Sequence, residues 1–119
     1  HLEDNRLAGF IPPSMGLLTR LTTLALTRNQ LYGSFLPEFK DFTDLQYLYL
    51  DDNQFTGGVL DVSGLTKLVI LNLQRNSLTG PVPASLGRLS EMRYLYLNHN
   101  QLSGTIPDIF APLTKLYNL

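Results

Sequence analysis

The chain has 119 residues, of which 44% are hydrophobic and 16% are charged, and its formal net charge is −1. This composition is typical of a folded soluble protein, and it excludes the strong positive field with which proteins attract nucleic acid or anionic membranes. The absence of cysteine excludes a disulfide framework and a thiolate metal site. No apolar run is long enough to span a membrane. We therefore expect a folded segment that holds no cofactor, binds no nucleic acid and does not insert into a membrane.

A unit of about 24 residues recurs along the whole sequence. Each copy contains an asparagine followed by x-Leu-x-Gly, with Phe55 replacing the leucine in the third copy. The repeated asparagines are Asn5, Asn29, Asn53, Asn76 and Asn100, at intervals of 24, 24, 23 and 24 residues. Self-similarity at this period is typical of a solenoid, in which each repeat forms one coil. We expect one solenoid segment, 1–119, with repeats near residues 5–28, 29–52, 53–75, 76–99 and 100–119.

The residues before each asparagine follow the pattern Leu-x-x-Leu-x-Leu, as in Leu45, Leu48 and Leu50 before Asn53. Leu-x-Leu has a two-residue period, so we expect a short strand with its leucines facing inward. Successive strands should run parallel, roughly 4.8 Å apart. One coil buries little apolar surface alone, so a continuous core forms only when neighbouring coils stack.

The segment after each asparagine leads back to the next strand. It contains a glycine and, in most copies, a proline, as in Gly80-Pro81-Val82-Pro83. Proline removes a backbone donor and restricts its predecessor, which excludes a long helix. We expect short 3-10 turns and a second short strand on the convex side. The third copy is one residue short between Leu60 and Leu65 and carries no proline.

The repeated asparagine is a polar residue among buried leucines. A buried polar group is tolerated only when it is hydrogen-bonded. We therefore expect each asparagine side chain to point inward and to bond to turn backbone in adjacent coils. This role is structural.

Residues 76–97 read Asn-Ser-Leu-Thr-Gly-Pro-Val-Pro-Ala-Ser-Leu-Gly-Arg-Leu-Ser-Glu-Met-Arg-Tyr-Leu-Tyr-Leu. This stretch, and with it essentially the whole chain, resembles the plant-type leucine-rich repeat. The resemblance implies an α/β repeat solenoid, which is a right-handed coil of about five repeats with a parallel concave β-sheet. Such repeats form the ectodomains of receptor-like kinases and receptor-like proteins, and the polygalacturonase-inhibitor-like proteins.

Both ends of the sequence fall within a repeat. Leu113–Leu119 aligns with Leu18–Leu24 and stops before its strand is complete. Neither a capping helix nor the cysteine pairs that often flank such ectodomains are present. We expect an uncapped fragment whose parent chain continues into further repeats or caps.

The residues between the inward leucines form three outward columns. These columns are Thr23, Tyr47, Ile70, Tyr94 and Asn118; Ala25, Tyr49, Asn72 and Tyr96; and Glu3, Thr27, Asp51, Gln74 and Asn98. Tyrosine combines apolar area with a polar tip, which suits a binding surface. It is also a good strand residue that packs across rungs, so a purely structural role stays open. The predicted partner-binding residues are Tyr47, Tyr49, Asp51, Asn72, Gln74, Tyr94, Tyr96 and Asn98.

Two further columns alternate in charge. The columns are Arg20, Asp44, Lys67, Glu91 and Lys115 before the strands, and Asp4, Arg28, Asp52, Arg75 and then His99 before the asparagines. At rung spacing each charge would have opposite charges as neighbours. We interpret both columns as exposed ladders that favour stacking in register, although exposed ion pairs contribute little stability.

A column of hydroxyl residues also recurs at rung spacing. Its members are Thr19, Thr43, Thr66, Ser90 and Thr114. A regular hydroxyl array could match a crystal surface such as ice. The interpretation that we favour is that each hydroxyl bonds to local backbone where the chain turns into the strand.

No pattern in the sequence indicates catalysis. His1 is terminal, His99 lies between two asparagines, and no nucleophile triad, metal-ligand spacing or phosphate-binding loop is present. Our leading hypothesis is a non-catalytic module that binds a protein or peptide through the concave sheet, as part of a receptor-like ectodomain at the cell surface or outside the cell. The alternatives are a scaffold segment in a larger assembly, intracellular or organellar, and an inhibitor of a secreted hydrolase.

Overall fold

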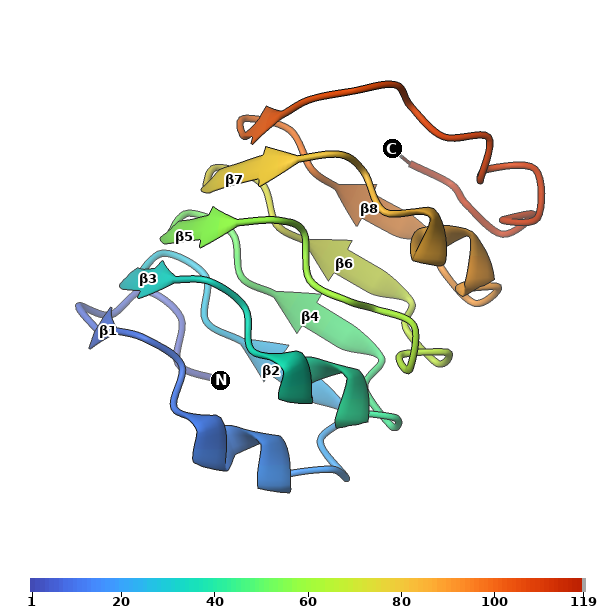
Figure 1. Cartoon of the computed structure of the whole chain (residues 1–119). Coiled ribbons are helices and arrows are strands. Elements are labelled where there is room, and N and C mark those ends of the chain that lie inside the picture. The colour runs from blue at the N-terminus through green and yellow to red at the C-terminus, as the bar shows by residue number, and fades with distance from the viewer. Residues whose placement is uncertain (119) are drawn as a thin grey trace.

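The computed structural model describes residues 1–118, which form a stack of coils (Figure 1). Each full coil contributes one strand to each of two parallel sheets. The four-stranded sheet contains β2 (Thr23–Ala25), β4 (Tyr47–Tyr49), β6 (Ile70–Asn72) and β8 (Tyr94–Tyr96). The five-stranded sheet contains β1 (Ala8–Gly9), β3 (Gln30–Gly33), β5 (Gln54–Gly57), β7 (Ser77–Gly80) and β9 (Gln101–Leu102). The predicted solenoid, its parallel sheet and its second short strand are confirmed.

Three coils return through a 3-10 helix. These helices are η1 (Pro13–Leu17), η2 (Pro37–Asp41) and η3 (Ala84–Arg88), and residues 1–118 contain no α-helix. Proline at the start of η1 and η2 favours this short turn, because its fixed φ suits the first helical position. The third coil, which lacks the proline and one residue, has no 3-10 helix, and neither does the described part of the last coil, which contains Pro107.

The two sheets differ in register. In the four-stranded sheet, residues at the same repeat position lie opposite one another, so that Thr23, Tyr47, Ile70 and Tyr94 form one column, which a bridge continues to Asn118. In the five-stranded sheet each strand is displaced by two residues against the one before. The resulting pairs are Ala8 with Gln30, Tyr32 with Gln54, Thr56 with Ser77 and Thr79 with Gln101. Because the displacement is even, alternate residues still face the same side.

The core runs through all the coils. Leucines of the inner coils, such as Leu45, Leu48 and Leu71, are fully buried. Phe39 of η2 and Phe42, which directly follows this helix, pack edge to face with ring centroids 5.4 Å apart. In the first coil, Leu18 is 54% exposed. The last residue of the predicted inward column, Leu119, lies outside the described residues.

Four of the five repeated asparagines link the coils as expected, whereas exposed Asn5 bonds only to carbonyls of its own coil. Asn53 Oδ1 accepts a hydrogen bond from the Leu31 N–H at 3.0 Å, and Asn53 Nδ2 donates to the carbonyls of Leu26 and Leu50. Asn29, Asn76 and Asn100 repeat this pattern. Each side chain thus satisfies backbone groups of its own coil and of the preceding one.

The residue before each asparagine adopts the left-handed backbone conformation. The five residues and their φ angles are Asp4 55°, Arg28 53°, Asp52 53°, Arg75 51° and His99 56°. Non-glycine residues rarely adopt a positive φ. The turn between the two sheets therefore imposes the same strained conformation on every coil.

Candidate functional site

The outward face of the four-stranded sheet carries a group of aromatic side chains. Tyr47 and Tyr49 project from β4, and Tyr94 and Tyr96 project from β8, because they alternate with buried leucines. All four are half-buried. The rings of Tyr94 and Tyr96 stack at a centroid distance of 6.5 Å and an interplanar angle of 16°. The face therefore offers apolar area together with phenolic hydroxyl groups.

Tyr117 extends this aromatic group but was missed by the sequence pattern. Its ring centroid lies 5.9 Å from that of Tyr94, and the residue is 83% exposed. Its backbone N–H donates to the Arg93 carbonyl, which holds it beside β8. Leu-x-x-Leu contains two free positions, and the three predicted binding columns use only the second, whereas Tyr117 occupies the first. Counting both would have found Tyr117.

The polar residues between the tyrosines are partly engaged with one another. Asn98 Nδ2 donates to Gln74 Oε1 at 3.3 Å, and Asn72 Oδ1 accepts the Gln74 backbone N–H at 3.2 Å. Asp51 is only 5% exposed and accepts a hydrogen bond from the Thr27 hydroxyl at 2.8 Å. The structure thus argues against a direct partner contact from Asp51, which stabilises the neighbouring coil instead.

Tyr49 lies on β4 and is separated by β6 from Tyr94 and Tyr96 on β8. Burial raises the pKa of its phenol, and Tyr47 and Asp51 nearby add to the shift. The hydroxyl therefore stays protonated at neutral pH and can donate a hydrogen bond. A neutral donor beside aromatic rings suits a partner that presents carbonyl groups and apolar side chains.

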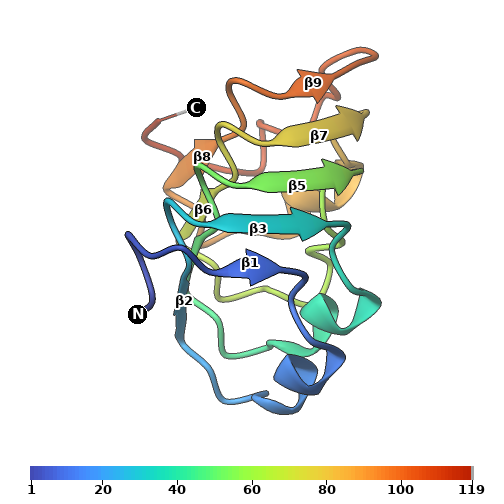
Figure 2. The same ribbon diagram turned by 90° about the vertical axis from the view of Figure 1, so that its left-hand side faces the viewer.

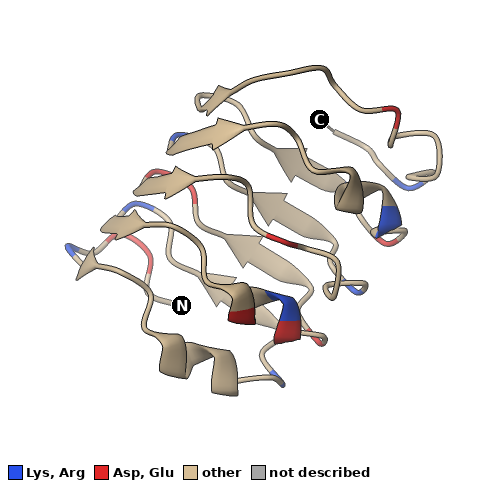
Figure 3. Ribbon diagram, viewed as in Figure 1, with Lys and Arg blue, Asp and Glu red and all other residues tan. Residues whose placement is uncertain are grey.

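Charged residues lie in the connecting segments and in the 3-10 helices η2 and η3, while the strands of both sheets carry none among the described residues (Figure 3). Lys67 Nζ bonds Asp44 at 2.6 Å, and Lys115 Nζ bonds both oxygens of Glu91 at 2.8 Å. Arg75 lies 3.6 Å from Asp52.

Asp4 and Arg28 form a further ion pair between the first two rungs. The guanidinium hydrogen bond lowers the pKa of Asp4, as that of Lys67 lowers the pKa of Asp44. Within residues 1–118 Arg20 makes no ion pair with Asp44. The charges thus join rungs two by two, whereas continuous ladders were expected.

The five hydroxyls of the predicted column are all exposed, and none bonds to the protein within residues 1–118. This applies to Thr19, Thr43, Thr66, Ser90 and Thr114. The prediction of local backbone bonding was therefore wrong. Near these positions the backbone groups hydrogen-bond to each other within the turn, as the Leu45 N–H does to the Phe42 carbonyl. The hydroxyl side chains are therefore left to bond with water.

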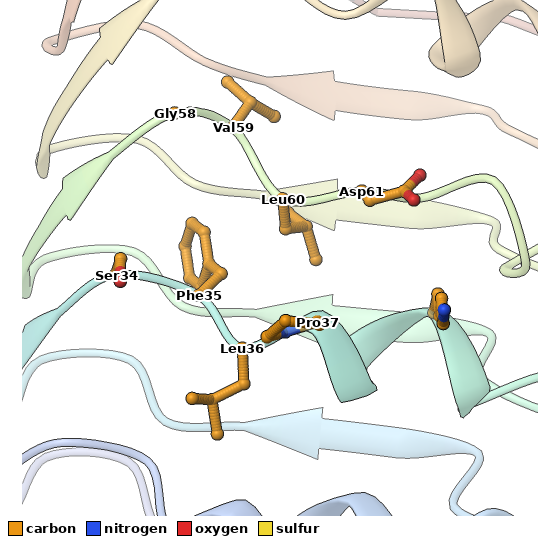
Figure 4. Close-up of a pocket in the computed structure, with 9 residues that line it drawn as sticks. Ser34, Phe35, Leu36, Pro37, Gly58, Val59, Leu60 and Asp61 are labelled. Carbon is orange, nitrogen blue, oxygen red and sulfur yellow. The ribbon is translucent and has the colours of Figure 1, made fainter.

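A groove of about 350 Å³ lies beside the short third coil (Figure 4). Ser34–Pro37 and Lys40 line one wall, and Gly58–Asp61 line the other. The third coil lacks the proline and the 3-10 helix that its preceding neighbour places here. A backbone hydrogen bond from Ser63 lowers the pKa of Asp61, so that carboxylate already has a local partner. We therefore attribute the groove to the shortening of the third repeat.

The described part of the chain holds no cluster of three or more His, Cys, Asp or Glu residues suited to a metal ion. None of its helices has the length and apolar character needed to cross a membrane. The described residues offer two surfaces for binding: the tyrosine-bearing face of the four-stranded sheet and the hydroxyl-bearing face of the five-stranded sheet. Ion pairs lie at their edges.

Family models match most of this repeat architecture. A model of the leucine-rich repeat matches residues 62–119, and a second model of the same repeat matches residues 44–65. The chain belongs to the plant-type leucine-rich repeat family.

Three relatives illustrate the range of this family. "Receptor-like kinase TMK4" of Arabidopsis thaliana is 39% identical over 56 residues, which is 47% of this chain and 6% of the kinase. A plant peptide hormone receptor, RGFR1 in complex with RGF2, has a TM-score of 0.92 at 36% identity over 98% of this chain and 19% of its own. A plant ice-binding protein has a TM-score of 0.90 at 34% identity over 98% of this chain and 41% of its own. The chain thus spans a minor part of each relative's length.

Proposed function

We propose that the chain is a non-catalytic recognition module that binds a protein or peptide through the four-stranded sheet. The observation that carries the proposal is the aromatic face formed by Tyr47, Tyr49, Tyr94 and Tyr96, to which Tyr117 is added. Asn72, Gln74 and Asn98 lie between or beside these rings as hydrogen-bonding groups. The likeness to a peptide hormone receptor supports this use of the sheet.

The charges around the site indicate the chemistry of its partner. Both rows of ionic residues are largely neutralised within the chain, and the strands themselves are uncharged. Affinity would then come from apolar contact and neutral hydrogen bonds. The partner would be an extended segment with apolar side chains and free carbonyls. Its setting would be a receptor-like ectodomain at the cell surface or outside the cell.

A peptide library displayed on phage tests this proposal. Peptides are selected on the wild-type chain and then measured against Tyr49→Ala/Tyr96→Ala and against Tyr32→Ala, which removes an exposed tyrosine from the other sheet. The double variant should weaken binding at least about 30-fold, since each buried aromatic anchor contributes about 1–2 kcal/mol or more. Tyr32→Ala should bind as the wild type does. Peptides that bind all three chains equally would place the site elsewhere.

A second candidate function is adsorption to ice. Two observations favour it: the likeness to a plant ice-binding protein, and exposed hydroxyls that make no hydrogen bond to the described chain. Its test is the growth of ice grains in a frozen sugar solution that contains the chain. Grains that grow as fast as with serum albumin would exclude this function. No residue among those described specifically favours the scaffold or the inhibitor hypothesis.

A further inference from the structure

The five-stranded sheet presents an open outward face. Figure 2 shows its strands side by side in one layer. Three of the outward cross-strand pairs on this face join polar side chains; the fourth, Ala8 with Gln30, does not. The three polar pairs are Tyr32 with Gln54, Thr56 with Ser77 and Thr79 with Gln101. Five of these side chains are exposed and Ser77 is half-buried, so the paired groups are available to solvent.

The hydroxyls at the centre of this face are free or weakly bound. Thr56 and Ser77 make no side-chain hydrogen bond within residues 1–118, and the Thr79 hydroxyl reaches the Gly57 carbonyl at 3.4 Å. Polar groups on neighbouring rungs can hold bridging water, and such positions would repeat with the strand spacing, roughly 4.8 Å. That repeat is close to the spacing of water molecules along one axis of hexagonal ice.

The face also lacks charge. None of the strands β1, β3, β5, β7 and β9 contains a charged residue, and the nearest rows of charge lie in the turns (Figure 3). A charged group holds its water strongly and in orientations set by the ion, which a water lattice does not match. An uncharged face can keep its hydration water in lattice positions. The sheet is thus compatible with a neutral, periodic surface.

Other occupants fit this face less well. A flat polysaccharide would need a row of aromatic rings to stack on, and of the six paired residues only Tyr32 is aromatic. A protein partner would need an apolar anchor at the centre, where Thr56, Ser77 and Thr79 lie. The other hydroxyl column is also a poor ice surface. In every coil it is followed directly by a charged residue, such as Asp44 after Thr43.

We propose that the face centred on Thr56, Ser77 and Thr79 is the surface on which the chain adsorbs to ice. This inference rests on the second function proposed above and assigns its site. The peptide surface and the ice surface would then be separate faces of the same coils. A substitution on one face should leave binding by the other face unchanged.

The test measures inhibition of ice recrystallisation by the full chain and by two matched variants. Thr56→Lys/Thr79→Lys places two cations on the proposed face, and Thr43→Lys/Thr66→Lys places two cations on the other hydroxyl column. The first should need at least about tenfold more protein for the same inhibition, because its ammonium groups replace lattice-like water. The second should match the wild type. Circular dichroism and melting temperature verify that both variants are folded.

Each outcome distinguishes the site from the function. An inactive wild type would overturn both the second function and its site. An active wild type with unchanged Thr56→Lys/Thr79→Lys would overturn the site alone. If only Thr43→Lys/Thr66→Lys lost inhibition of ice recrystallisation, the site would lie on the other hydroxyl column. Binding to crystalline cellulose without any effect on ice would overturn the proposal in favour of a polysaccharide.

Discussion

The two sheets are formed by the same coils, yet they differ in the register with which neighbouring coils pair. In the four-stranded sheet the register does not shift, so side chains at one repeat position become neighbours in space. In the five-stranded sheet the register shifts by two residues per coil, so the neighbours come from different repeat positions. A column read from the aligned repeats is therefore a real surface column in one sheet only.

The surfaces differ accordingly. The four-stranded sheet gathers tyrosines because repeat positions that hold Tyr47 and Tyr94 align across β6. From β3 to β9, the five-stranded sheet pairs a hydroxyl with a hydroxyl or an amide, as in Thr56 with Ser77. One repeat thus provides an aromatic face and a polar, uncharged face. Four predictions test this difference.

The largest effect is expected from cysteine pairs that test the shifted register, since the natural chain contains no cysteine. Thr56→Cys/Ser77→Cys should oxidise readily, because directly opposite residues satisfy the Cα separation of about 4.4–6.8 Å that a disulfide needs. Thr56→Cys/Thr79→Cys is the control. Thr79 lies two residues, or roughly 7 Å, further along β7. Mobility on non-reducing gels measures the cross-link, and faster oxidation of the control pair would contradict the shift.

The next effect concerns the asparagines that tie the sheets together. Asn53→Ala removes the acceptor of the Leu31 N–H and the donor to two carbonyls, and should lower the free energy of unfolding by roughly 3 kcal/mol. Asn5→Ala is the matched control, since exposed Asn5 bonds only to the carbonyls of Leu2 and Glu3. Its cost should stay below about 1 kcal/mol. Urea unfolding measures both, and equal losses would refute the role of the inner ladder.

A smaller effect is expected in the turn between the sheets. Arg75→Val places a β-branched residue at φ 51° and should cost about 1–2 kcal/mol. Arg75→Asn loses the same ion pair to Asp52 but tolerates the left-handed conformation, so it should be nearly neutral. The melting temperatures of the two variants separate strain from charge. A lower melting temperature for Arg75→Asn than for Arg75→Val would exclude strain as the cause.

The smallest effect concerns the charge rows. Asp44→Lys should lower the melting temperature at low salt, because it places three cations in succession with Arg20 and Lys67, whereas Asp44→Asn should lower it less. The pKa of Asp44 is lowered in the folded chain, so its contribution is complete above about pH 4 and is lost as the pH falls through the folded pKa. The difference between wild type and Asp44→Asn should therefore vanish in acid. A difference that persists there would show that charge is not its cause.

Much of the fold follows from local patterns, and part of the site does too. Leu-x-Leu, the repeated asparagine and the prolines each carry a local physical requirement, so strands, ladder and 3-10 turns were predictable. The outward placement of Tyr47 and Tyr94 followed from the same alternation. The burial of Asp51 did not, because it depends on Thr27 in the preceding coil. The lack of hydrogen bonds to the column hydroxyls could not be predicted either, because it depends on which backbone groups in the turns hydrogen-bond to each other.

By itself the sequence determined the coil: its period, its inward leucines, its two strands and its asparagine ladder. These features repeat because each is satisfied within one coil or by an identical neighbour. Only the tertiary structure decided how far each sheet shifts from coil to coil, which charges pair and which polar groups remain open to solvent. Those properties depend on the twist and spacing between coils, which no single repeat contains. The two candidate surfaces arise from that relation between coils.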